Sequence, residues 1–170
     1  MRPSPDEYHP AFGTYMTLAP EDDVLEALAE QSATTQRILS ALDDDKSLHR
    51  YAEGKWSVRE VFGHLIDSER ILGYRALAIA RGEQENLPAF EEEDYVRNAS
   101  FDAWPVGALA ESYALVRKTT ILFYRNLSEE AWLRRGTANN NPITVRALAW
   151  GILGHERHHL GVLRDKYGVV

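Results

Sequence analysis

The sequence TVRALAWGILGHERHHLGVLRDK, residues 144–166, indicates the fold class of this chain. The polar run Gly136 to Asn141, followed by Pro142, is typical of a turn, and Thr144 is a favoured residue to cap a helix. After it, apolar side chains recur at alternating spacings of three and four, which predicts an amphipathic helix that runs to about Gly168. Its stripe consists of Val145, Leu148, Ile152, His155, His159, Val162 and Lys166. The chain therefore ends in a long helix with two histidines on its inward-facing stripe.

Three further segments carry the same helical period. The clearest start in the chain is at Trp56, where Ser57 and Glu60 form a capping box, and Gly82 supplies the stop of that helix. An earlier helix follows Pro20, and a later one opens at Pro105 and ends near residue 127. The sequence shows no convincing strand and no internal repeat. We therefore expect an all-α fold, an up-down four-helix bundle.

Two segments lie outside this helical pattern. The first twenty residues hold four of the seven prolines, with aromatic residues between them, and predict an irregular N-terminal arm that packs on the body. Residues 83–104 show no clear period and form one longer connection. Their acidic run, Glu91 to Asp94, is interpreted as a solvated loop.

Length and composition restrict the function. A chain of 170 residues fits a single domain, residues 1–170, with one core. Its 19 Lys and Arg against 26 Asp and Glu give a net charge of −7, which disfavours nucleic acid as a partner. There is no cysteine, so any metal must be held by His, Asp or Glu. Because no secretory signal or membrane span is visible, we expect a soluble cytoplasmic protein without a membrane partner.

The histidines are the strongest chemical signal. His155 and His159, at positions i and i+4, lie one above the other on the same helical face and can both reach one divalent cation. His64 lies at the edge of the apolar stripe of the helix after Ser57, where it faces a neighbouring helix. His158 falls about 80° off the stripe and is excluded as a first choice. The alternative is that these are core histidines satisfied by hydrogen bonds, but two on one stripe favour a shared partner.

Short-motif alternatives fit less well. Residues 155–159 match the HExxH pattern of zinc proteases, with Glu156 in the general-base position. Only eleven residues follow His159 and no mixed fold is expected, which disfavours a protease. A di-iron bundle needs two Glu-x-x-His motifs, and the sequence offers one, at Glu156–His159.

Other polar residues are candidates for supporting roles. Arg75 lies on the His64 side of its helix and is a candidate to steer an anionic group of a substrate, although an ordinary ion pair at the bundle surface is the alternative. Asp67 or Glu69 could accept a hydrogen bond from the second nitrogen of a ligating histidine. The sequence does not choose between these two carboxylates.

Several motifs together resemble the DinB-like family. They are KWSVRE at 55–60, GHLIDSER at 63–70, YRA at 74–76, ARG at 80–82, TVRAL at 144–148 and GHERHHL at 154–160. The resemblance covers nearly the whole chain, and the arrangement of three histidines is its most specific part. It implies a four-helix bundle of the DinB/YfiT type, often a homodimer, that binds a divalent metal such as zinc or nickel. By motif position the ligands are His64, His155 and His159.

The resemblance leaves three functional hypotheses open. Similar bundles act as thiol-dependent S-transferases or isomerases with bacillithiol, mycothiol or glutathione as cosubstrate; here a metal-bound thiolate would attack a small electrophile. Others are described as metal-dependent hydrolases, in which a metal-bound water attacks with Glu156 or another carboxylate as base. In the third hypothesis the metal is structural and the bundle is a stress-response or interaction module. Three visible ligands favour an enzyme that acts on a small molecule.

Overall fold

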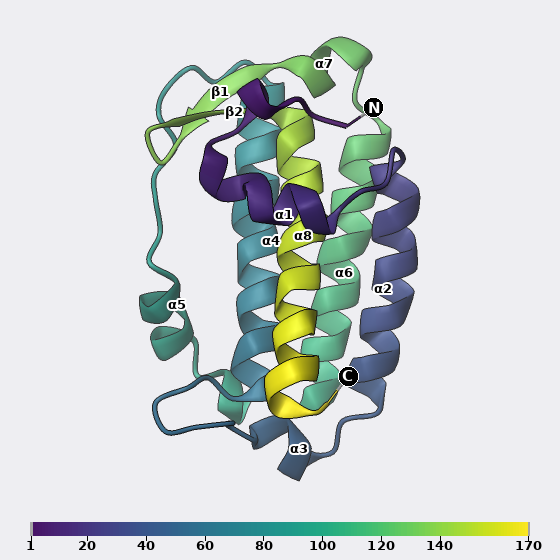
Figure 1. Ribbon diagram of the computed structural model, residues 1–170, viewed down its shortest axis with the longest axis vertical. Coiled ribbons are helices and arrows are strands. Elements are labelled where there is room, and N and C mark those ends of the chain that lie inside the picture. Colours follow the sequence, from purple (N-terminus) through teal and green to yellow (C-terminus); the bar gives the residue numbers. More distant parts are fainter. Residues whose placement is uncertain (1, 170) are drawn as a thin grey trace.

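The computed structural model describes residues 2–169, and within them four long helices form a bundle. They are α2 (Val24–Ser40), α4 (Val58–Ala80), α6 (Val106–Arg125) and α8 (Val145–Val162). Figure 1 shows the four helices side by side along the long axis of the molecule. The four-helix bundle predicted from the sequence is confirmed. None of the described helices has the length and apolarity that crossing a membrane requires.

The expected up-down order of the helices needs one correction. Arg117 of α6 pairs with Glu69 of α4, and Arg59 near the start of α4 donates to the carbonyl of Trp104, just before α6. These contacts show that α4 and α6 run parallel, and Figure 1 shows both rising from the end of the bundle that carries α3. The reason is the connection 81–105, which returns along the side of the bundle before α6 begins. Helices α2 and α8 run in the opposite direction to this pair.

The long helices begin at the caps that the sequence indicates. The Ser57 hydroxyl accepts from the Glu60 amide at 3.0 Å, and the Glu60 carboxylate accepts from the Ser57 amide at 2.7 Å, which completes the capping box of α4. Asp23 caps α2, and the Thr144 hydroxyl caps α8. Helix α8 continues into one π-helical turn, Leu163–Tyr167, which ends at Gly168 with a left-handed backbone.

The connections contain more structure than the sequence predicted. The acidic run is not a solvated loop: it forms the first turn of α5 (Glu92–Ala99), where negative charge suits the helix dipole. Residues interpreted as a turn form a hairpin of β1 (Arg135–Ala138) and β2 (Asn141–Thr144), which corrects the expectation of no strand. Asn139 and Asn140 have φ angles of 51° and 59°, as a tight hairpin turn requires. The connections also contain two short helices, α3 (Asp44–Leu48) and α7 (Glu129–Leu133), and the 3₁₀ turn η3 (Phe101–Ala103).

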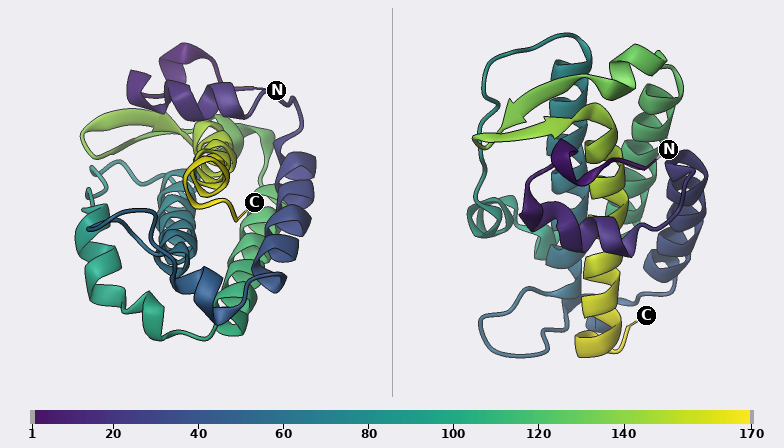
Figure 2. Two further views of the ribbon diagram at one scale, coloured as in Figure 1. Left: turned by 60° about the horizontal axis from the view of Figure 1, so that its bottom comes forward. Right: turned by 45° about the horizontal axis from the view of Figure 1, so that its top comes forward.

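The N-terminal arm packs on α8. It consists of two 3₁₀ turns, η1 (Pro5–Glu7) and η2 (Pro10–Phe12), and the helix α1 (Gly13–Leu18), and Figure 2 shows it crossing α8. Two glycines of α8 allow the close approach. A Cβ atom on Gly154 would lie 2.0 Å from the carbonyl oxygen of Tyr15, and one on Gly151 would lie 2.6 Å from the ring of Phe12. The arm therefore places the Tyr15 ring beside His155, which directly follows Gly154.

Candidate metal centre

Three histidines from two facing helices meet inside the bundle. His64 lies on α4, and His155 and His159 lie one turn apart on α8. One ring nitrogen of each lies within 4.8 Å of a ring nitrogen of the other two, and the Nε2 atoms of His64 and His155 are 3.1 Å apart. His64 and His155 are 2% and 7% exposed. The structure thus brings together the three histidines that the sequence singles out as candidate ligands, and leaves the neighbouring His158 exposed.

The imidazoles of this triad are held neutral. Burial lowers the pKa of His64 to about 4. Burial, with the neighbouring imidazoles His64 and His158 adding to it, lowers the pKa of His159 to about 3, and the pKa of His155 lies well below its ordinary value for the same reasons. A neutral imidazole offers a lone pair to a metal, whereas an imidazolium cannot. Three converging neutral nitrogens fit a divalent transition metal such as zinc.

Three side chains form the walls around the triad. The Ser68 hydroxyl, one turn after His64, lies 3.4 Å from His64 Nδ1. The Trp56 ring lies 4.9 Å from the His64 ring, and the Tyr15 ring lies edge-on to His155 at 5.4 Å. The sequence pattern does not assign these three residues to the site. Only Ser68 had a signal there, its position four residues after His64 on the same helix face.

Helix α5 contacts one of the aromatic walls. The Trp56 indole N–H donates to Glu93 at 3.0 Å. Burial raises the pKa of Glu92, its acidic neighbours raise it further, and His158 acts against them. The charge of Glu92 also adds to the burial that raises the pKa of the Tyr15 hydroxyl. The long connection thus carries a carboxylate whose charge acts on both Tyr15 and His158.

Glu156 lies in the bundle interior in a different setting from the one expected of a general base. Its Oε1 accepts from the Thr35 hydroxyl at 2.5 Å and the Tyr113 hydroxyl at 2.6 Å. Its Oε2 accepts from Arg117 at 2.6 Å. A carboxylate engaged by three donors is poorly placed to take a proton from water. Its role as a base therefore has no support in this geometry.

The remaining candidates also have structural partners. Arg75 is 8% exposed, donates to the carbonyl of Pro88 at 2.7 Å and lies over the ring of Phe90, so it fastens the long connection to α4. Its predicted contact with a substrate stays a prediction. Asp67 pairs with Arg70, and Glu69 pairs with Arg117. Among the described contacts, neither carboxylate accepts a hydrogen bond from an imidazole of the triad, which is the role that the sequence left open between them.

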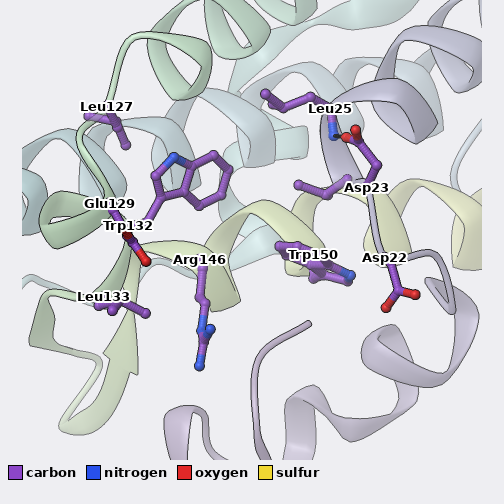
Figure 3. Close-up of a pocket in the computed structure, with 10 residues that line it drawn as sticks. Asp22, Asp23, Leu25, Leu127, Glu129, Trp132, Leu133, Arg146 and Trp150 are labelled. Atoms are coloured by element: carbon purple, nitrogen blue, oxygen red, sulfur yellow. Dashed lines mark hydrogen bonds between the residues drawn. The ribbon is translucent and has the colours of Figure 1, made fainter. Parts of the chain in front are cut away.

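A cavity of about 560 Å³ lies away from the triad, where α2 and α8 begin. Figure 3 shows Trp132 and Trp150 in its walls, with Arg146 below them. Arg146 is paired with the buried Glu7 of the arm, and the Trp150 indole N–H donates to the Glu21 carbonyl. No histidine lines this cavity, so it is separate from the triad.

The sequence of residues 27–163 matches the DinB superfamily. This chain belongs to that superfamily. A DinB-like relative from Oceanobacillus iheyensis, named as a candidate metal-dependent hydrolase, is 23% identical over 146 residues, which are 84% of each chain.

Two solved structures share the DinB fold of this chain. YfiT from Bacillus subtilis, described as a candidate metal-dependent hydrolase with an unusual four-helix bundle topology, has a TM-score of 0.71 at 18% identity. The alignment covers 99% of this chain and 94% of YfiT. The mycothiol-dependent maleylpyruvate isomerase has a TM-score of 0.67 at 17% identity, with 86% of this chain and 62% of that chain covered. At these identities the two likenesses show the fold.

Proposed function

We propose that this DinB-like protein is a metal-dependent enzyme that uses a low-molecular-weight thiol to act on small electrophiles. The observation that carries the proposal is the convergence of His64, His155 and His159, three neutral nitrogens from two helices. Within residues 2–169, no carboxylate joins this cluster as a fourth ligand. A site with three protein ligands leaves coordination positions for a small molecule, as catalytic zinc sites do. The names of the hydrolase-like relatives and of the mycothiol-dependent isomerase support a metal and a thiol, respectively.

Zinc and nickel are the metals that we propose for the site. Imidazole suits both ions, and the chain has no cysteine that would favour softer metals. When bound, such a cation supplies Lewis acidity, which lowers the pKa of a thiol or water in an open position.

The side chains around the triad favour a thiol over water. A free thiol has a pKa of about 8.5 and needs little help to ionise near neutral pH, whereas water benefits from a positioned base. Glu156, the carboxylate next to His155, is occupied by three donors. Trp56 and Tyr15 give the site apolar walls that exclude bulk water and can pack against the electrophile.

Hydrolysis is the second candidate function, and one observation favours it. The charge of Glu92, on α5, acts on both Tyr15 and His158, and burial raises the pKa of Glu92 above its ordinary value. In that case Glu92, rather than Glu156, holds the proton taken from water. Replacement of Glu92 by Gln then abolishes hydrolysis, whereas the thiol reaction survives the same change.

A cobalt-substituted protein tests the two functions against each other. The cobalt form is titrated with bacillithiol, mycothiol, glutathione and a simple thiol, and ligation of sulfur is followed by its charge-transfer absorption. Tight binding of one biological thiol but not of the simple thiol supports the proposal. Metal without thiol binding favours hydrolysis or a structural role, and a protein that takes up no metal contradicts both enzyme functions. The variant His158→Ala, with the exposed histidine removed, is the control that keeps the triad.

A further inference from the structure

A cluster of three charged side chains is sealed inside the bundle. Arg117 of α6 binds both oxygens of Glu69 at 2.8 to 3.2 Å and one oxygen of Glu156 at 2.6 Å. The side chains of these three residues are 1%, 4% and 3% exposed. They come from α6, α4 and α8, so the cluster joins three of the four long helices.

The charges in this cluster do not cancel. Two carboxylates share one guanidinium, and the other donors to Glu156 are the neutral hydroxyls of Thr35 and Tyr113. Arg117 also donates to the Leu28 carbonyl, which is neutral, at 3.3 Å. The contacts of the described chain therefore leave one net negative charge in the interior. An uncompensated buried charge is strongly unfavourable, since it has lost its hydration.

One histidine of the triad, His155, lies beside this cluster. Glu156 directly follows His155 on α8, and Glu69 lies five residues after His64 on α4. Glu69, Glu156 and His155 line the same small internal void. Charges in a poorly solvated interior are screened far less than charges at the surface, so they act on each other without direct contact.

We propose that the Glu69–Arg117–Glu156 cluster is the internal counter-charge of the divalent metal, and that it sets the affinity of the site without ligating the ion. This inference rests on the proposed metal function. Three neutral imidazoles do not offset the two positive charges that a divalent ion brings into the bundle. The excess negative charge of the cluster offsets one of them. Glu69 and Glu156 are thus positioning residues for a cation.

Zinc affinity of the full chain, measured by competition with a chelator at one neutral pH, tests the inference. Glu69→Gln and Glu156→Gln remove one charge and keep the side-chain shape. Tyr113→Phe perturbs the same network without changing its charge. Glu7→Gln is a matched control, because Glu7 is a 2% exposed carboxylate bound by Arg146 and Thr144, balanced one to one by that arginine. Its partner Arg146 lies nine residues from His155, about 13 Å along α8.

The inference predicts a loss of zinc affinity of about ten- to a hundredfold for Glu69→Gln and Glu156→Gln, the size typical of residues behind metal ligands. Tyr113→Phe and Glu7→Gln stay within about threefold of the parent protein. The rise in unfolding temperature that zinc causes gives a second readout, and it shrinks only in the two charge-removing variants. Equal affinity and equal thermal shift in all four variants overturn the inference while the metal site stands. A parent protein that binds no zinc overturns the proposed function itself.

Discussion

The Nε2 atoms of His64 and His155 lie 3.1 Å apart, although 91 positions separate the two residues in the sequence. The contact exists only because α4 and α8 pack against each other in opposite directions. No local segment of the chain therefore forms the site. Metal binding should be coupled to folding of the bundle, since the unfolded chain has no such site.

The ligand assignment predicts different outcomes for four alanine variants. His64→Ala, His155→Ala and His159→Ala each remove one of three nitrogens, and we expect zinc affinity to fall by at least about a hundredfold. His158→Ala leaves affinity unchanged, because this exposed residue lies outside the cluster. Equilibrium dialysis of the chelator-treated proteins measures the difference. Equal losses in all four variants would contradict the assignment.

The metal-free protein should lose stability as the pH falls below about 6.5. Burial lowers the pKa of His64 from 6.5 to about 4, so in this range the unfolded chain binds a proton that the folded chain does not. Protons therefore favour the unfolded state, and the free energy of unfolding falls by about 2 kcal/mol for His64 alone at a pH near 5. Urea unfolding of the parent and of His64→Gln, each measured above pH 6.5 and again near pH 5, checks this. An equally large decrease in the variant speaks against the assigned burial effect.

Two glycines of α8 make a matched pair for testing how the arm is seated. A methyl group at Gly154 would lie 2.0 Å from the carbonyl oxygen of Tyr15. Because this oxygen belongs to the backbone, it cannot move away easily. We expect Gly154→Ala to lower the free energy of unfolding by about 1–3 kcal/mol. Gly161 has nothing within 4 Å, so Gly161→Ala should stabilise the helix by up to about 1 kcal/mol. Thermal unfolding of both variants measures these changes in stability. An equal loss of stability in the two variants would refute the close approach of α1 to α8.

Arg75 should act on the long connection rather than on the metal. Arg75→Ala removes a charged donor to the Pro88 carbonyl and the cation over Phe90, and we expect a loss of about 1–3 kcal/mol. Amide hydrogen exchange of residues 83–91 should become faster while zinc affinity stays the same. Arg70→Ala is the control, since its exposed pair with Asp67 contributes less than about 1 kcal/mol. Unchanged exchange in 83–91 would show that Arg75 does not anchor this segment.

The sequence could predict the parts of the structure that depend on local signals. The Ser57 capping box marks the start of α4, and the stripe of α8 places His155 and His159 on a buried face. These features depend on spacings of three or four residues, which a single helix expresses without its partners.

The remaining features depend on contacts between distant segments. The parallel course of α4 and α6 follows from the route of the connection 81–105, and no spacing encodes a route. Glu156 occupies the general-base position of a motif, but its actual partners, Thr35, Tyr113 and Arg117, lie on α2 and α6. The hairpin strands are four residues long and lack an alternating pattern, although Asn139 and Asn140 are residues that tight hairpin turns favour.

In our proposal, His64, His155 and His159 hold one divalent metal with open coordination positions. Anomalous diffraction at the zinc edge from crystals of the zinc-loaded protein locates the ion. We expect one peak about 2.0–2.1 Å from a nitrogen of each of the three histidines, with the remaining coordination completed by atoms from outside the chain. No peak at the triad, or a peak with a fourth protein ligand that closes the coordination shell, would contradict it.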